Sequence, residues 1–165
     1  MNARESETVP RPVEYGGAVY GSLLAASVVA GSAAGTPSTV ADLVALLIST
    51  GVVFWLAHVY VRLVEHGLHP LTWRRVRAAG RVEWPLAQAA FPPAVAAAFA
   101  SVLGLSDGAA TWVALGVAVS TQVAWAVAAA VTAGLGRTGI AVSAVINLGL
   151  GLIVILLKTL VSGGH

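Results

Sequence analysis

The sequence contains no cysteine, and charged residues make up only 10% of its 165 positions. The absence of cysteine excludes disulfide bonds and thiolate chemistry. Soluble domains carry about 25% charged residues, so this chain has too few charges to cover a surface that faces water. A nucleic-acid partner would need a broad basic face, and a single stretch with four arginines does not provide one. The composition therefore argues against a soluble domain and against a nucleic-acid partner.

The sequence also lacks the motifs of common enzymes. It contains no nucleophile beside a base, no pair of carboxylates, no phosphate-binding loop and no dinucleotide fingerprint. Membrane enzymes need several polar residues that converge at one interface, whereas the polar residues here are scattered along the chain. We therefore expect a protein that is not an enzyme and that uses no cofactor.

The spacing of the histidines argues against a metal site. His58 and His66 are eight residues apart, which in a helix is about 12 Å along the axis and too far for one shared ion. Pro70 directly follows His69 and removes it from helical geometry. Glu65, His66 and His69 are therefore not expected to form a ligand cluster.

Apolar residues dominate the composition. They make up 58% of the sequence, the mean hydropathy is +0.86, and the 18 glycines fit membrane helices that approach one another closely. We expect an all-α fold, namely a polytopic transmembrane helix bundle with five membrane-spanning helices behind a polar cytoplasmic tail of residues 1–14. Residues 15–165 then form a single transmembrane domain, with helices at about 16–34, 40–66, 85–105, 110–135 and 140–161. A basic cytoplasmic loop at 67–83 is expected to contain a short interfacial helix that carries Trp73.

The third predicted helix is interrupted by two prolines. Pro92 and Pro93 have no backbone N–H group, so the carbonyl oxygens of Gln88 and Ala89 lose their helical donors and a kink is expected there. Freed carbonyls that line a cavity bind cations or water, and Gln122 of the fourth helix is polar at mid-membrane depth. Gln88 and Gln122 are therefore transport candidates. The alternative is that a neighbouring helix satisfies these groups.

The basic residues indicate the orientation of the bundle. Four arginines are concentrated in the predicted 67–83 loop: Arg74, Arg75, Arg77 and Arg81. Loops rich in lysine and arginine remain in the cytoplasm, so five spans place the N-terminus inside and the C-terminus outside the bacterial inner membrane. The predicted outer loops contain Asp42 and Asp107 and no basic residue. Lys158 lies near the outer end of the last helix, where we expect its side chain to reach the interface.

Three ionisable residues share one face of the second predicted helix. His58, Arg62 and Glu65 are spaced by four and three residues, which places them on one side of an α-helix. Ionisable groups within hydrocarbon face a cavity or a partner, because their desolvation is unfavourable. One interpretation is a proton-titrating or gating His58 above an Arg62–Glu65 pair. The alternative is a structural His58 that is hydrogen-bonded to a neighbouring helix, with Arg62 and Glu65 solvated at the interface.

Small residues recur every four positions in the last helix, and the first helix carries a shorter stripe of the same kind. These stripes comprise Gly139, Ser143, Asn147 and Gly151 in the last helix and Gly17 and Gly21 in the first. Small faces let helix backbones approach, and Asn147 would then form a hydrogen bond between helices. The alternative for the longer stripe is the polar lining of a pore.

The basic loop also contains Trp73 directly before its first two arginines. Tryptophan and arginine at a membrane surface favour contact with anionic lipid headgroups. The residues proposed for this contact are Trp73, Arg74, Arg75, Arg77 and Arg81. The alternative is that the positive-inside topology alone accounts for these charges.

Two stretches resemble a group of known proteins. They are Glu14-Tyr15-Gly16 leading into Gly21-Ser22-Leu23-Leu24-Ala25-Ala26, and Phe54-Trp55-Leu56-Ala57-His58-Val59-Tyr60. Together they resemble small, uncharacterised multi-spanning integral membrane proteins of actinobacteria, chiefly over the first two predicted helices. The resemblance implies an inner-membrane location and carries no activity.

These features lead to two functional hypotheses. The first is an oligomeric channel or transporter for protons or small cations, a homo-oligomer whose subunits pack through small-residue faces and form a polar path near His58. The second is a non-catalytic membrane partner or assembly subunit that stabilises or regulates another membrane protein. Bilayer lipid, including anionic lipid at the basic loop, is an expected partner in both cases.

Overall fold

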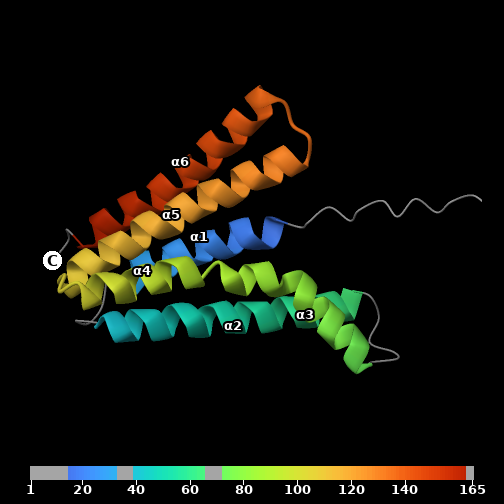
Figure 1. Cartoon of the computed structure of the whole chain (residues 1–165), viewed down its shortest axis with the longest axis horizontal. Helices are drawn as coiled ribbons and strands as arrows, with labels where there is room; N and C mark the ends of the chain where they lie inside the picture. Colours follow the sequence, from blue (N-terminus) through green and yellow to red (C-terminus); the bar gives the residue numbers. More distant parts are fainter. Residues whose placement is uncertain (1–14, 33–38, 66–71, 163–165) are drawn as a thin grey trace, which may run out of the picture.

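The computed structural model describes residues 15–32, 39–65 and 72–162 (Figure 1). Within these ranges it contains six α-helices and no strand. The helices are α1 (Gly16–Gly31), α2 (Val40–Glu65), α3 (Trp73–Gln88), α4 (Phe91–Val102), α5 (Asp107–Thr132) and α6 (Arg137–Ser162). The all-α fold is confirmed for this part of the chain. The predicted tail of residues 1–14 and residues 67–71 of the predicted basic loop lie outside the described residues.

Three helices are long and apolar enough to cross a membrane, namely α2, α5 and α6. The helices α3 and α4 meet at a bend of 40° and pass the same test together, so they form a fourth crossing if the bent pair is one span and a re-entrant loop if it is not. The 16 residues of α1 form a shorter apolar helix, about 24 Å long against a hydrocarbon core of about 30 Å. These apolar helices indicate a membrane protein, and the described residues provide three or four crossings by length and composition. The five predicted spans are not confirmed.

The helix α3 runs without a break from Trp73 to Gln88, although the sequence predicted a short interfacial helix at Trp73 within a loop up to residue 83 and a separate helix from residue 85. The hydroxyl oxygen of Thr72 accepts a hydrogen bond from the N–H of Arg75 and caps the helix. Pro85 lies inside α3 rather than in its first turn. The predicted break between the two helices was wrong, because packing of the arginine-rich segment against α2, through contacts such as the hydrogen bond from Trp55 to the carbonyl of Gly80, favours one continuous helix.

The chain bends at Ala89 and Ala90, between two helices, instead of kinking within one helix at Pro92-Pro93. Both prolines lie in the first turn of α4, where backbone N–H groups have no helical acceptor in any case. A helix that restarts before the prolines therefore accommodates them without a broken hydrogen bond. The predicted single kinked helix over residues 85–105 is not confirmed.

The helices α4 and α5 end at residues 102 and 132 instead of the predicted 105 and 135. Each is followed by a glycine in the left-handed region, Gly104 with φ of +80° and Gly134 with φ of +72°. The N–H of Leu105 then bonds back to the carbonyl of Ala100 at 3.1 Å, and the loop after α5 repeats this arrangement. This glycine-dependent helix end reverses the chain tightly in both loops.

The short helix α1 lies at the centre of the bundle. Successive passes alternate in direction, with α1, α3–α4 and α6 running one way and α2 and α5 the other (Figure 1). α1 packs against α2, α3, α5 and α6, and its Ala18, Ala26 and Val29 have no exposed surface, at 0% each. Most of the core residues are alanine, valine and leucine. Such small side chains let backbones approach closely, as is typical of membrane helices.

The arginines of the described residues gather at one end of the bundle, where α2 ends and α3 and α6 begin (Figure 1). They are Arg62, Arg74, Arg75, Arg77, Arg81 and Arg137. The helices α2 and α5 begin at the opposite end, where Asp42 and Asp107 lie in their first turns. The folded bundle therefore has the charge asymmetry that the sequence indicated.

Candidate functional site

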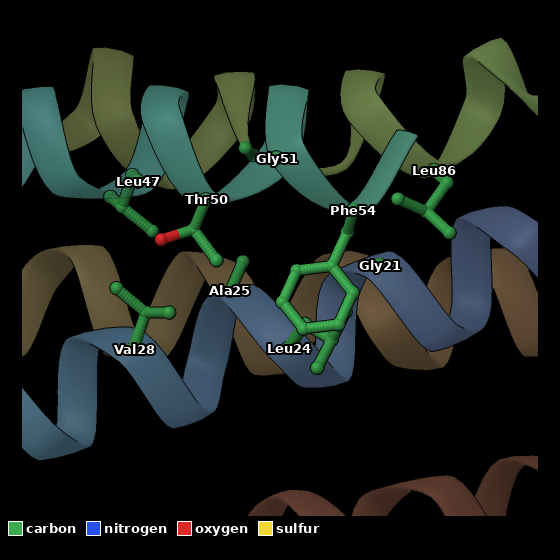
Figure 2. Close-up of a pocket in the computed structure, with 10 residues that line it drawn as sticks. Gly21, Leu24, Ala25, Val28, Leu47, Thr50, Gly51, Phe54 and Leu86 are labelled. Carbon is green, nitrogen blue, oxygen red and sulfur yellow. The ribbon is translucent and has the colours of Figure 1, made fainter. Parts of the chain in front are cut away.

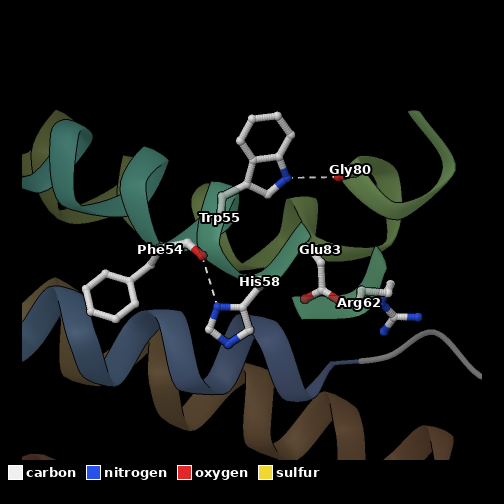
Figure 3. A network of polar contacts seen from close by, with 6 residues as sticks. All are labelled: Phe54, Trp55, His58, Arg62, Gly80 and Glu83. Carbon is white, nitrogen blue, oxygen red and sulfur yellow. Dashed lines mark hydrogen bonds and ion pairs between the residues drawn. The ribbon is translucent and has the colours of Figure 1, made fainter. Parts of the chain in front are cut away.

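His58 is half-buried on the side of α2 that faces α1 (Figure 3). Its Nδ1 atom lies 2.9 Å from the carbonyl oxygen of Phe54, one turn earlier in the same helix. Because a carbonyl oxygen only accepts, Nδ1 is the donor in this contact. The ring centroid lies 5.8 Å from that of Tyr20 on α1. The hydrogen bond expected to a neighbouring helix is therefore formed within α2.

Arg62 is paired with Glu83 of α3 and not with Glu65. The Nε atom of Arg62 donates to Oε1 of Glu83, and the two side chains are 30% and 13% exposed. Glu65, at the last position of α2, is exposed. The pair joins the end of α2 to α3 across 21 residues of sequence. The structure therefore does not assemble the group of His58, Arg62 and Glu65 that the helical spacing indicated.

The side chains of Gln122 and Ser143 join α5 to α6, and that of Asn147 bonds within α6. The amide of Gln122 donates to the backbone carbonyl of Asn147 at 3.2 Å, and the hydroxyl of Ser143 donates to the carbonyl of Ala126 at 3.3 Å. The amide of Asn147 donates to the carbonyl of Ser143 at 2.9 Å. Gln122 has no exposed surface, and among the described residues its Oε1 has no hydrogen-bond partner. The polar part of the small-residue stripe thus lies against α5.

Two glycines of the predicted stripes lie in close helix contacts. A Cβ atom added at Gly151 would lie 2.5 Å from Cγ1 of Val119 on α5. One added at Gly21 would lie 2.5 Å from the carbonyl oxygen of Leu86 on α3, and Gly17 faces the same residue at 3.7 Å. The first and last helices therefore use these small residues to pack within the chain.

Two other predicted residues lie apart from these contacts. Gln88 is exposed at the end of α3, whereas Gln122 is fully buried, so the two glutamines have different surroundings. Gly139 lies in the first turn of α6, where an added Cβ would meet Cβ of Leu135 in the preceding loop at 3.1 Å. Neither residue joins two helices in the way that Gly151 does.

Lys158 is buried, at 4% exposure, although the sequence indicated that it would reach the interface. Its Nζ atom lies 3.3 Å from the carbonyl oxygen of Val29 and 5.1 Å from the centroid of the Trp112 ring. Val29 belongs to the last turn of α1, where carbonyl groups lack helical donors and the helix dipole is negative. Lys158 therefore joins α6 to both α1 and α5. Its spacing of seven residues from Gly151 places it on the buried face, and this signal was present in the sequence.

A small cavity of about 10 Å³ lies between α1, α2 and the α3–α4 bend (Figure 2). Its lining is apolar except for Thr50, and the ring of Phe54 points from α2 toward α1 beside Leu24. A cavity of this size holds about one water molecule. His58 is not among its lining residues.

A larger groove of about 550 Å³ opens between α2 and α3, and we refer to it as the α2–α3 groove. Its lining residues are Trp55, Leu56 and Val59 of α2 and Trp73, Val76, Arg77, Gly80, Arg81 and Trp84 of α3. The indole N–H of Trp55 donates to the carbonyl of Gly80 at 2.9 Å (Figure 3), and its ring meets that of Trp84 edge to face at 5.8 Å. Arg74 and Arg75 are exposed on the same helix but do not line the groove.

The outer face of α5 also carries small residues, which the sequence analysis did not identify as a packing face. Gly116, Ser120 and Ala124 follow one another every four residues, and all three are exposed. A Cβ added at Gly116 would meet no atom within 4 Å. The exposed face of α6 is instead built from bulky side chains such as Val145 and Ile146, at 68% and 56% exposure. The sequence shows this four-residue repeat of small residues in α5, but the repeat of small residues in α6 is longer.

Comparison with protein-family models finds no match for this chain, and neither do comparisons with curated proteins and with solved structures.

Proposed function

We propose that the chain crosses the bacterial inner membrane five times, with its N-terminus in the cytoplasm and its C-terminus outside. The alternating helix directions and the arginines gathered at one end support this orientation. The central position of α1 supports its role as a fifth crossing, because neighbouring helices on several sides shield a short helix from lipid. A phosphatase reporter fused after His165 should be active outside the cell. A reporter active only in the cytoplasm would contradict the orientation.

We further propose that the protein is a non-catalytic membrane assembly subunit, which associates with a second copy of itself through the outer face of α5. The observation that carries this proposal is the exposed line of Gly116, Ser120 and Ala124. Membrane helices associate where small residues let two backbones approach, because close packing replaces the contacts that lipid makes. The small residues Gly21 and Gly151 already face helices of their own chain, whereas those of α5 remain available.

The polar groups of the bundle support assembly rather than conduction. Gln122 bonds to α6, Lys158 bonds to α1, and His58 bonds within α2. The cavity between α1 and α2 has room for about one water molecule. Polar side chains engaged in this way fix the relative positions of helices, which is what an assembly subunit requires.

Disulfide cross-linking tests the α5 contact directly, because the natural sequence has no cysteine. We expect Ser120→Cys to form a disulfide-linked dimer in native membranes, since a disulfide requires Cα atoms about 4.4–6.8 Å apart. Leu148→Cys is the matched control. Leu148 is exposed on α6 next to Asn147, the partner of Gln122, so it lies at a similar depth to Ser120.

A bulky substitution distinguishes a specific contact from random collision. Gly116→Leu places its side chain in open space on the monomer, so the fold should remain intact while the cross-link through Ser120→Cys is lost. Equal cross-linking at Ser120→Cys and Leu148→Cys, or a cross-link unaffected by Gly116→Leu, would refute an α5 interface.

A proton or cation channel is the second candidate, and the position of His58 favours it. His58 is half-buried beside Tyr20, which is 43% exposed, so a path along these residues would form at the outer surface between subunits. In reconstituted vesicles this candidate predicts a pH-dependent flux that His58→Ala abolishes while the fold is retained. The absence of such a flux would rule out the channel.

A further inference from the structure

We infer that the α2–α3 groove binds an anionic glycerophospholipid, with its phosphate at Arg77 and Arg81 and an acyl chain along Trp55, Leu56 and Trp84. The inference requires that α2 crosses the membrane with the start of α3 at its surface. It does not depend on how the chain assembles, so the two proposals can fail separately.

The charged end of the groove is suited to a phosphate group. Arg77 and Arg81 are one helical turn apart and both line the groove. Both are exposed, and among the described residues neither forms an ion pair. The nearby carboxylate of Glu83 is paired with Arg62 and is therefore already compensated. Guanidinium groups match phosphate oxygens in a two-pronged geometry, so the two arginines can hold one phosphate between them.

The apolar wall of the groove is preformed. The Trp55 ring is held by its hydrogen bond to Gly80 and by its edge contact with Trp84. A Cβ added at Gly80 would lie 3.2 Å from the Trp55 ring, so glycine lets α3 approach the indole. Leu56 remains 53% exposed and Trp84 41% exposed, which leaves apolar surface for a chain to cover.

Charge and depth together identify the occupant. The wall formed by Leu56 and Val59 belongs to a membrane-spanning helix, which a water-soluble acidic peptide does not reach. A lipid without net charge fits the apolar wall, but it does not neutralise the positive charges of Arg77 and Arg81. Tryptophan side chains concentrate at membrane interfaces. At that depth the phosphate group and the first part of an acyl chain of one lipid lie close together, so one groove contacts both. An anionic glycerophospholipid provides a phosphate group for the two arginines and an acyl chain for the apolar wall.

Native mass spectrometry of the purified full-length protein tests the inference, with phosphatidylglycerol and phosphatidylcholine titrated separately. We expect a stoichiometric phosphatidylglycerol adduct that phosphatidylcholine does not match. The double variant R77Q/R81Q should weaken phosphatidylglycerol binding by at least about tenfold. The control R74Q/R75Q removes the same charge from the same helix outside the groove and should retain most of the binding.

A second pair of variants tests the apolar wall without changing charge. Leu56→Trp fills the groove and should weaken phosphatidylglycerol binding, whereas Val53→Trp adds the same side chain at an exposed position of α2 that does not line the groove. Size-exclusion profiles in detergent verify that all variants are folded. Equal losses in R77Q/R81Q and R74Q/R75Q would indicate general surface attraction and overturn the site. Unchanged binding in Leu56→Trp, or equal binding of the two lipids, would also overturn it.

Discussion

Lys158 of α6 donates to the carbonyl oxygen of Val29 at the end of α1, 3.3 Å away. This contact joins two residues that are 129 positions apart in sequence, and its environment predicts different outcomes for two substitutions. The same carbonyl also accepts from the hydroxyl of Ser32 at 2.9 Å, so it retains a donor when the lysine is removed.

Lys158→Met should therefore change the free energy of unfolding by no more than about 1 kcal/mol, because an apolar side chain of similar length replaces a desolvated ammonium group. Lys158→Glu should lower it by at least about 2 kcal/mol, since a carboxylate would face a carbonyl oxygen and the negative end of a helix dipole. Thermal unfolding in detergent measures both. Similar midpoints for the two variants would show that the side chain points away from Val29.

Gly21→Ala should destabilise the bundle. The added Cβ would lie 2.5 Å from the carbonyl oxygen of Leu86, a backbone atom that cannot rotate away, and overpacking of this kind costs about 1–3 kcal/mol. Gly31→Ala is the matched control in the same helix, because a Cβ there meets no atom within 4 Å. If Gly21→Ala unfolds at the same temperature as Gly31→Ala, then α1 and α3 do not approach as closely as described.

Gln122→Met should be nearly neutral for stability. The substitution loses a 3.2 Å bond to Asn147, and such bonds between membrane helices contribute about 0.6 kcal/mol on average. It also removes a buried oxygen that has no partner among the described residues, and an unsatisfied group of this kind costs about 1–3 kcal/mol. Chemical or thermal unfolding of the purified variant checks this balance. A loss of several kcal/mol would mean that Oε1 has a bound partner.

The Arg62–Glu83 pair should give a measurable coupling in a double-mutant cycle. With side chains 30% and 13% exposed, R62Q and E83Q should each reduce stability, and the coupling between them should be about 1 kcal/mol. Glu65→Gln removes the exposed carboxylate and serves as control, with no coupling to R62Q expected. A larger coupling energy of Arg62 with Glu65 than with Glu83 would show that Arg62 pairs with Glu65, as helical spacing indicated.

Local patterns predicted the helical class and the ends of α2, because a long apolar run followed by Gly67 and Pro70 leaves few alternatives. Gly104 and Gly134 lay inside the helices predicted at 85–105 and 110–135, because the residue at which each helix stops depends on a left-handed glycine conformation that spacing does not reveal. A short helix at Trp73 was expected, but its continuation to Gln88 was missed, because that continuation depends on contact with α2.

The partners of the polar residues could not be predicted from spacing. Glu65 lies three residues from Arg62 on the same helix, yet Glu83, distant in sequence, lies closer in space. The same limit applies to Lys158, whose acceptor Val29 is on the first helix. Helical periodicity identifies which residues share a face, but it does not identify which helix packs against that face.

We propose that the polar residues of the bundle hold its helices together and do not conduct ions. Proton flux into vesicles that contain the purified protein, measured with an internal pH-sensitive dye under an imposed potential, distinguishes these two roles. We expect the same flux as in protein-free vesicles. We also expect His58→Ala, which loses the Phe54 and Tyr20 contacts, to lower the unfolding temperature. A flux in the wild-type protein that His58→Ala abolishes, without a change in fold or stability, would show that the polar residues conduct protons.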